Sequence, residues 1–123
     1  ILNTGSVLAA HPAPHLFATH AYAAAKAGIE GFSKSIAAYY AKDNIRINVL
    51  APGLIATNMS LRAQTDQTIL DYIRLKQPLD GGRMGSPEDV VGAALYFMSD
   101  LSRFVTGQVI GVDGGWSVSE GGG

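Results

Sequence analysis

The sequence predicts an α/β fold in which three parallel strands alternate with helices. Three short apolar segments rich in β-branched residues have the character of strands, namely 1–7, 45–50 and 109–112. Segments in which apolar residues recur at helical spacing separate them, over about 21–41, 58–76 and 86–99. A helix between two strands returns the chain to the end where the first strand began, so the strands are expected to pair in parallel.

The long helix expected over 21–41 follows a loop and carries an apolar stripe. Pro12 and Pro14 disfavour a regular helix in the preceding segment, 11–20. The stripe, which is expected to face the core, consists of Ile29, Phe32, Ile36 and Tyr40. A smoother face, against which another helix could pack closely, consists of Gly28, Gly31 and Ser35.

In the later part of the chain, residues that typically end a strand or begin a helix mark the boundaries of the expected elements. Pro52-Gly53 is expected to end the second strand. The polar, weakly amphipathic segment 58–76 is expected to form one or two short helices. Ser86 is a good N-cap and is followed by proline and two acids, which is typical of a helix start. Residues 117–123 are expected to be a disordered tail.

The composition narrows the range of possible functions. The chain has 123 residues, is 47% hydrophobic and 15% charged, and has a formal net charge of -1. This composition is that of a single core-forming domain, and without a basic cluster it argues against a nucleic-acid partner. No apolar run reaches the roughly 18 residues of a membrane span and no signal peptide opens the chain, so no membrane contact and a cytoplasmic location are expected.

Metal and disulfide chemistry have little support in the sequence. The chain has no cysteine, which excludes disulfides and thiolate metal sites. Its three histidines, His11, His15 and His20, all fall in the proline-containing loop. A zinc site there is conceivable, but no carboxylate or cysteine lies nearby in sequence, so a loop that faces solvent or substrate is the preferred interpretation.

The most informative motif is Tyr22-Ala23-Ala24-Ala25-Lys26 at the start of the long helix. Side chains four residues apart on a helix are neighbours, with Cβ atoms roughly 5–6 Å apart. An ammonium group beside a phenol favours the phenolate, which makes the pair suitable for proton transfer. The spacing alone also occurs by chance on exposed helices, so its weight depends on the surrounding residues.

Two further candidates follow strands. Ser6 comes after the first strand, and the loop from Pro52 to Thr57 follows the second. Ligands in open α/β sheets bind beyond the carboxyl ends of the strands, where these residues and Tyr22 with Lys26 could converge. Taken singly, each also has a structural interpretation, because Ser6 could cap a turn and Thr57 could cap a helix.

Five motifs in this order closely resemble the C-terminal half of a short-chain dehydrogenase/reductase. They are Asn3-Thr4-Gly5-Ser6, Tyr22 to Lys26, Ala51 to Thr57, Thr106-Gly107-Gln108 and Val112-Asp113-Gly114-Gly115. The resemblance covers about 1–116 and is nearest to the oxoacyl-carrier-protein reductase and sugar or polyol dehydrogenase branch. It implies a doubly wound, Rossmann-like fold of which 1–123 is a partial NAD(P)-binding domain. A complete domain would need roughly twice the length, and the chain is expected to be part of a longer polypeptide.

The resemblance implies a hydride transfer between NAD(P)(H) and a carbonyl or secondary alcohol. Ser6 would hydrogen-bond the substrate oxygen, and Tyr22 would be the general acid in reduction and the general base in oxidation. Lys26 would make the phenol of Tyr22 more acidic and hydrogen-bond the nicotinamide ribose. Negative charge that develops on a carbonyl oxygen needs a proton donor and a second hydrogen bond, which this division of roles provides. A small polar or acyl-type substrate is preferred.

The resemblance also implies cofactor contacts from the second loop. Pro52 and Gly53 would let the chain pass close to the nicotinamide. Ile55 would offer backbone groups to the carboxamide, and Thr57 would reach the carboxamide or the pyrophosphate. A homodimer or homotetramer is the expected assembly.

Two departures from the family pattern matter. Sixteen positions separate Ser6 from Tyr22, about three more than is usual, and this surplus makes four loop residues candidates for substrate specificity: His15, Leu16, Phe17 and His20. The family's N-terminal half, with its glycine-rich phosphate loop, has no equivalent here. The segment alone is therefore expected to bind NAD(P) poorly, and NAD cannot be distinguished from NADP.

Two other functions remain open at this stage. The chain could be an inactive truncated domain that serves only in subunit association. A hydrolase that uses Ser6 with a loop histidine is disfavoured, because the Gly-x-Ser-x-Gly nucleophile elbow is absent.

Overall fold

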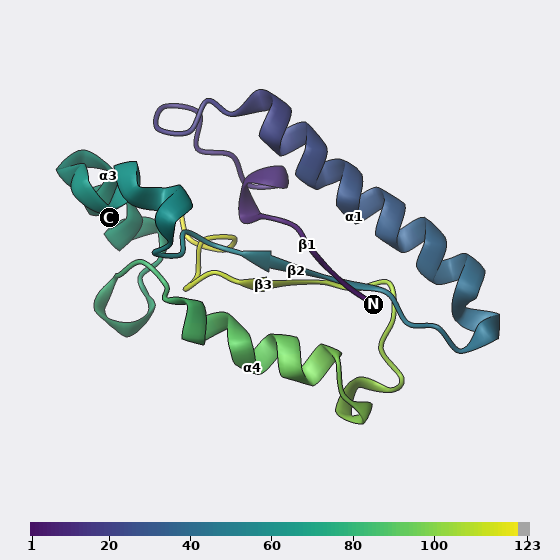
Figure 1. Ribbon diagram of the computed structural model, residues 1–123. Helices are drawn as coiled ribbons and strands as arrows, with labels where there is room; N and C mark the ends of the chain where they lie inside the picture. Colours follow the sequence, from purple (N-terminus) through teal and green to yellow (C-terminus); the bar gives the residue numbers. More distant parts are fainter. Residues whose placement is uncertain (121–123) are drawn as a thin grey trace.

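A three-stranded parallel sheet forms the centre of the computed structural model, which describes residues 1–120 (Figure 1). The strands are β1 (Leu2–Thr4), β2 (Asn48–Pro52) and β3 (Val109–Val112), in the order β1-β2-β3. Asn3 pairs with Val49, which pairs in turn with Val109. All three strands therefore end at the same edge of the sheet, as the α/β prediction requires.

Helices cover both faces of the sheet and its carboxyl edge. The long helix α1 (His20–Tyr40) and α4 (Pro87–Phe97) lie on opposite faces, while α2 (Leu61–Thr65) and α3 (Gln67–Lys76) lie beyond the end of β2 (Figure 1). Short 3₁₀ segments connect these elements: Val7–Ala9, Ala41–Asp43, Asn58–Ser60, Leu79–Gly81 and Asp100–Ser102. The chain adopts the fold of one half of a doubly wound sheet.

The buried residues form a sheet core and two clusters at its carboxyl edge. Ile47, Val49, Leu50 and Ala51 are buried in and beside β2. One cluster groups Val7, Ala13 and Trp116, and the other groups Ala63, Ile69 and Ile73. Phe17 and Leu54 pack against both clusters, so the loop after β1 and the loop after β2 share one apolar support.

The apolar stripe expected on α1 is only partly correct. Ile29 and Ile36 are half-buried as expected, but Phe32 is 63% exposed and Tyr40 is 40% exposed. The fully buried residues of the helix are Ser33 and Ala37. Asn3 of β1 donates a hydrogen bond from Nδ2 to Ser33 Oγ at 2.9 Å, so Ser33 faces the sheet. Helical periodicity does not reveal this polar contact, which places Ser33 rather than its neighbour Phe32 against the sheet.

Several boundaries agree with the sequence and others shift. The third strand occupies the expected residues, and the segment 58–76 forms two short helices as expected. The first strand ends at Thr4 rather than Val7, because Ser6 caps the 3₁₀ segment that follows. The second strand begins later than expected and includes Pro52. Gly53, the next residue, continues the pairing by donating a hydrogen bond to the Val112 oxygen at 3.0 Å.

The tail expected from residue 117 is partly wrong. Residues 114–118 form a turn, and Ser119 after it donates from its backbone to the Gly115 oxygen and from its hydroxyl to the Leu75 oxygen, both at 2.9 Å. Burial opposes ionisation of Asp113, but hydrogen bonds from Ser117 and from backbone N–H groups outweigh it and hold its pKa below the ordinary value. The remainder of the expected tail, 121–123, lies outside the described residues.

The start of α4 follows the sequence signal at Ser86. Ser86 and Asp89 form a capping box, and Pro87 is the first helical residue. The helix ends at Phe97, two residues before the expected end. Among residues 1–120, no helix is both long and apolar enough to cross a membrane.

Candidate active site

Ser6 lies at the carboxyl end of β1, where the chain leaves the sheet. Gly5 still pairs with the sheet by donating to the Leu50 oxygen at 2.7 Å, and Ser6 then begins the 3₁₀ segment. The Ser6 side chain is buried, and its Oγ accepts a hydrogen bond from the Leu8 N–H at 3.2 Å. The capping role that the sequence suggested as an alternative is therefore present. It leaves the hydroxyl proton available to a second partner.

Tyr22 and Lys26 lie on the first turns of α1 and share one environment. The Lys26 Nζ is 5.6 Å from the centre of the Tyr22 ring, which is within the range of a cation–π contact. The same ammonium donates a hydrogen bond to the Thr4 oxygen at 3.1 Å, at the last residue of β1. Lys26 thus connects the helix to Thr4 at the end of β1, two residues before Ser6. The Tyr22 side chain is 39% exposed.

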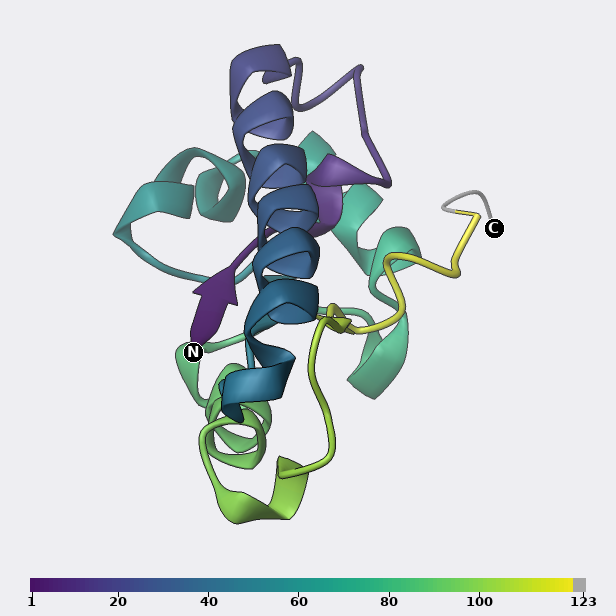
Figure 2. The ribbon, with the colours of Figure 1, turned by 90° about the vertical axis from the view of Figure 1, so that its right-hand side faces the viewer.

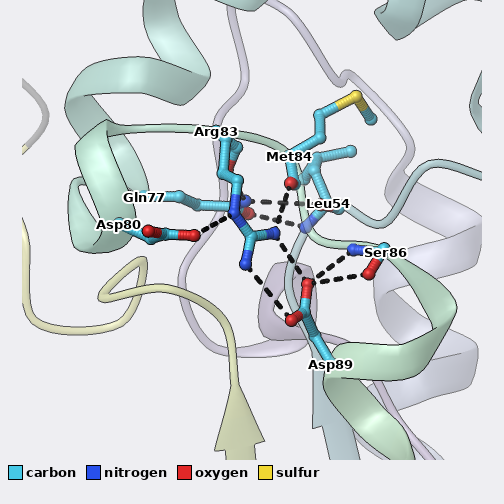
Figure 3. Close-up of polar contacts among 7 residues, drawn as sticks. All are labelled: Leu54, Gln77, Asp80, Arg83, Met84, Ser86 and Asp89. Carbon is cyan, nitrogen blue, oxygen red and sulfur yellow. Dashed lines mark hydrogen bonds and ion pairs between the residues drawn. The ribbon is translucent and has the colours of Figure 1, made fainter.

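A buried amide holds the loop after β2 in place. Gln77, at the end of α3, is 2% exposed. Its Oε1 accepts from the Leu54 N–H at 2.6 Å, and its Nε2 donates to the Leu54 oxygen at 3.3 Å and to the Arg83 oxygen at 3.0 Å (Figure 3). Gly53 lies against this amide, because a Cβ there would come within 2.6 Å of Gln77 Oε1 and 2.9 Å of the Asp113 Cα. The glycine is therefore required by the packing of the protein itself.

The next residues of the loop are fixed from two sides. Gly85 pairs with Ile55 in an isolated parallel bridge, donating to the Leu54 oxygen at 2.9 Å and accepting from the Ala56 N–H at 2.8 Å. Ser60 accepts from the Thr57 N–H at 2.9 Å and donates to the Ile55 oxygen at 2.7 Å. Within residues 1–120, the Ile55 N–H has no hydrogen-bond partner, so it is available to a ligand.

An exposed ion-pair cluster supports this loop from outside. The Arg83 guanidinium contacts Asp80 Oδ2 at 2.7 Å through Nε and Asp89 Oδ2 at 2.7 Å through Nη1 (Figure 3). Hydrogen bonds from Arg83 and from Ser86 hold the pKa of Asp89 well below its usual range. The same contacts with Asp89 and Asp80 raise the pKa of Arg83. A cavity of about 180 Å³ lies between this cluster and the end of β3.

The four residues expected to govern specificity fall into different places. His15 and Leu16 line a second cavity, of about 350 Å³, between the loop and α3. Phe17 packs below the loop against both apolar clusters, with the Arg62 guanidinium 5.7 Å from its ring centre. His20 is exposed as the first residue of α1. Among residues 1–120, no group of three or more His, Cys, Asp or Glu side chains could hold a metal ion.

The comparison with known proteins adds a direct assignment. A family model described as enoyl-(acyl carrier protein) reductase matches residues 1–117. The chain belongs to the short-chain dehydrogenase/reductase family.

Curated members of the short-chain dehydrogenase/reductase family resemble the chain over most of its length. The 3-oxoacyl-[acyl-carrier-protein] reductase FabG of Chlamydia trachomatis is 42% identical over 115 residues, which are 94% of this chain and 44% of that protein. The Thermotoga maritima FabG is 43% identical over 117 residues, again 94% and 44%. The gluconate 5-dehydrogenase of Gluconobacter oxydans is 40% identical over 98 residues, 80% and 38%.

Solved structures of dehydrogenases match the fold closely. A 4-hydroxyisoleucine dehydrogenase complexed with NADH has a TM-score of 0.87 at 33% identity and matches 98% of this chain and 47% of its own. A gluconate 5-dehydrogenase from Burkholderia cenocepacia in complex with NADP and tartrate has a TM-score of 0.87 at 32% identity, with 97% and 45% covered. The chain thus spans a little less than half the length of these relatives. Its sheet is a part of the Rossmann-like fold that they share.

Sequence reasoning missed Gln77, Arg83 and Gly85, which position the loop after β2. Gln77 and Arg83 lie twenty or more residues beyond the loop, so neither spacing nor periodicity connects them with it. The one available signal was the capping pattern at Ser86, because Asp89 of that cap is also the partner of Arg83.

Proposed function

We propose that the protein of which this chain forms a part transfers a hydride between NAD(P)(H) and a carbonyl or secondary alcohol, with Tyr22 as general acid and base. The observation that carries the proposal is the position of Lys26. Its ammonium lies against the Tyr22 ring and hydrogen-bonds the end of β1, so that Ser6, Tyr22 and Lys26 belong to the same end of the sheet. Proton donor, cation and second hydroxyl are the groups that carbonyl reduction requires.

The chemistry divides among these residues as follows. In reduction, the Tyr22 hydroxyl gives its proton to the carbonyl oxygen, and the Ser6 hydroxyl donates a hydrogen bond to the same oxygen. The Lys26 ammonium lies beside the ring from which the proton is lost, and the Thr4 carbonyl orients that ammonium. In oxidation the phenolate takes the proton from the alcohol. The nicotinamide supplies or receives the hydride, and the protein supplies position and charge.

The loop after β2 fits the nicotinamide carboxamide. A carboxamide carries one acceptor and two donors, and the free Ile55 N–H is a donor for its oxygen. Thr57 follows on the same fixed loop, with an exposed side chain. Pro52 and Gly53 bring the chain close to the sheet edge without a bulky side chain. The related structures hold NADH, NAD+ or NADP, so either cofactor is compatible with this half of the fold.

We further propose a cytoplasmic homodimer or homotetramer. The outer side of α1 is open in Figure 2, and a Cβ on Gly28 or Gly31 would meet nothing within 4 Å among the described residues. Phe32 and Tyr39 are largely exposed on this helix. Such a surface, smooth and apolar, suits the close approach of a helix from a second copy.

The test is Tyr22→Phe in the full-length protein, followed by nicotinamide absorbance with a panel of carbonyl substrates. Loss of a general acid lowers the rate by roughly 10²–10⁴-fold. Tyr39→Phe is the matched control, because Tyr39 is an exposed tyrosine at the opposite end of the same helix. Full turnover by Tyr22→Phe on a substrate that the unmodified protein reduces would contradict the assignment.

A further inference from the structure

A buried hydrogen bond joins β1 to α1 at a distance from the proposed catalytic residues. Asn3, in the middle of β1, donates from Nδ2 to Ser33 Oγ at 2.9 Å. The Ser33 side chain is only 1% exposed, so this polar contact lies inside the interface between the helix and the sheet. A hydrogen bond in such a place depends on direction and is costly to leave unmade.

The contacts between α1 and the end of β1 follow one face of the helix. Lys26 donates to the Thr4 oxygen at 3.1 Å, and a Cβ on Gly5 would lie 3.7 Å from Glu30 Oε1. Ser33 makes the third contact, one turn further along the helix. Lys26, Glu30 and Ser33 are at positions i, i+4 and i+7, which is the spacing of neighbours on one helix face. This face therefore lies along the carboxyl end of β1.

Tyr22 lies on the same helix face, eleven positions before Ser33. Since an α-helix has roughly 3.6 residues per turn, eleven positions are close to three full turns, or about 16 Å along the axis. The two side chains therefore leave the helix in nearly the same direction. A rotation of α1 that broke the Ser33 contact would turn Tyr22 by the same angle, away from the strand end that carries Ser6.

Apolar packing alone determines this rotation weakly. Besides Ser33, the fully buried residue of α1 is Ala37, a small side chain that interlocks little with the sheet. Ile29 and Ile36 are only half-buried. Burial of apolar surface is favourable in any direction, whereas a hydrogen bond is favourable in one. The hydrogen bond from Asn3 is thus the contact that selects one rotation of the helix.

We propose that Asn3 and Ser33 are positioning residues for the reaction: their hydrogen bond sets the rotation of α1 on β1 and thereby directs Tyr22 toward the strand end where Ser6 lies. The proposal rests on the proposed oxidoreductase function and adds two residues that act only through Tyr22. Misplacement of a reacting group by about 1 Å can lower a rate by 10²-fold, so loss of this hydrogen bond is expected to lower kcat roughly tenfold.

Ser33→Ala in the full-length protein tests the positioning role, because it removes only the hydroxyl that accepts from Asn3. The assay uses NADH or NADPH with ethyl acetoacetate, cyclohexanone and D-fructose, and a cofactor titration gives the concentration of folded sites. For the carbonyl that is reduced fastest, kcat per folded site should fall roughly tenfold. KM should change less than about twofold, because the binding of substrate is not altered.

Ser35→Ala is the matched control, since Ser35 is an exposed serine of the same helix. It should leave both kcat and KM unchanged. An equal fall of kcat in Ser35→Ala and Ser33→Ala would overturn the proposal, because the loss would then not depend on the buried hydrogen bond.

A double-mutant cycle tests whether the two residues act through one bond. Asn3→Ala should lower kcat about as much as Ser33→Ala, and the double variant should lower it no further than either single variant. Losses that multiply in the double variant would overturn the proposal, because they would show two independent contributions.

The solvent isotope effect distinguishes positioning from a merely structural role. In Ser33→Ala, proton donation by a misplaced Tyr22 should limit the rate more strongly, so the ratio of kcat in ordinary water to kcat in heavy water should rise. Partial unfolding would lower kcat and leave this ratio unchanged, and that result would overturn the proposal.

The same assays separate this proposal from the function on which it rests. Full turnover by Tyr22→Phe, or absence of turnover with every carbonyl of the panel, would contradict the oxidoreductase function. Turnover that is lost in Tyr22→Phe but unchanged in Ser33→Ala and Asn3→Ala would overturn the present proposal alone.

Discussion

The two loops at the carboxyl edge of the sheet differ in how they are held. The loop after β2 is fixed by a buried amide, a backbone bridge to Gly85 and the hydroxyl of Ser60. The loop after β1 is longer, and between residues 11 and 19 it lies mostly at the surface. Its main attachments are the Trp116 indole and the Arg62 guanidinium.

This contrast agrees with the two different roles that we propose for these loops. A loop that contacts the same nicotinamide group in every reaction benefits from being preorganised, because no ordering free energy is then needed on binding. A loop that contacts the variable part of a substrate can change in length, since added residues change the closure entropy little. The surplus of residues between Ser6 and Tyr22 falls in the loop after β1, for which we propose the second role.

The largest effect on stability is expected from Gln77→Ala, which removes the buried support of the loop after β2. The Leu54 N–H, the Leu54 oxygen and the Arg83 oxygen would lose their partner in a buried place. The expected loss is about 3 kcal/mol of unfolding free energy, measured by urea denaturation of the full-length protein. Gln67→Ala, at an exposed position, should cost less than about 0.5 kcal/mol. If Gln77→Ala lowered the unfolding free energy no more than Gln67→Ala does, the loop after β2 would not be held more firmly than the loop after β1.

Gly53→Ala should have the next largest effect. A methyl group there would meet Gln77 Oε1 at 2.6 Å and the Asp113 Cα at 2.9 Å, and the second of these is backbone that cannot move aside alone. Such overpacking costs about 1–3 kcal/mol. The same denaturation experiment measures it, and an unchanged midpoint would show that the loop adapts more readily than its contacts indicate.

How much of the fold and of the candidate site the sequence predicts depends on how far apart in sequence the interacting residues lie. The third strand and the Ser86 cap were predictable because their signals are local, as β-branched residues and a Ser-Pro-Glu-Asp run. The outward turn of Phe32 and the support from Gln77 were not, because each depends on a polar contact across more than twenty residues. Motif order was enough to name the candidate residues Ser6, Tyr22 and Lys26, whose roles stay predictions.

Gly28→Ala tests the open face of α1, because the sign of its effect distinguishes a free helix from a helix in contact with a second copy. In an exposed helix interior, alanine is more favourable than glycine by about 1 kcal/mol, and the new methyl group meets nothing in this chain. The unfolding free energy should therefore rise by this amount in a protein whose α1 face is free. Since we propose that this face contacts a second copy, we expect a fall instead, together with a smaller mass in analytical ultracentrifugation. A rise with an unchanged mass would contradict the proposed contact.

The smallest effect is expected at the Arg83 cluster, which is exposed to solvent and salt. Since hydrogen bonds from Arg83 lower the pKa of Asp89 in the folded state, its contribution to stability is present above about pH 4 and is lost as the pH falls further. The unfolding midpoints of the unmodified protein and Asp89→Asn should thus differ slightly at pH 7, and this difference should shrink as the pH falls from about 4 to about 2. A constant difference over this range would show that Asp89 acts through packing.

Trp116 is the single tryptophan of these 123 residues and is completely enclosed. Its fluorescence should consequently be blue-shifted, and it should respond when the segment around His11 moves or when a molecule settles beside Tyr72. The chain therefore contains its own optical reporter of the loop after β1, and rapid-mixing experiments can follow movements of that loop without a dye.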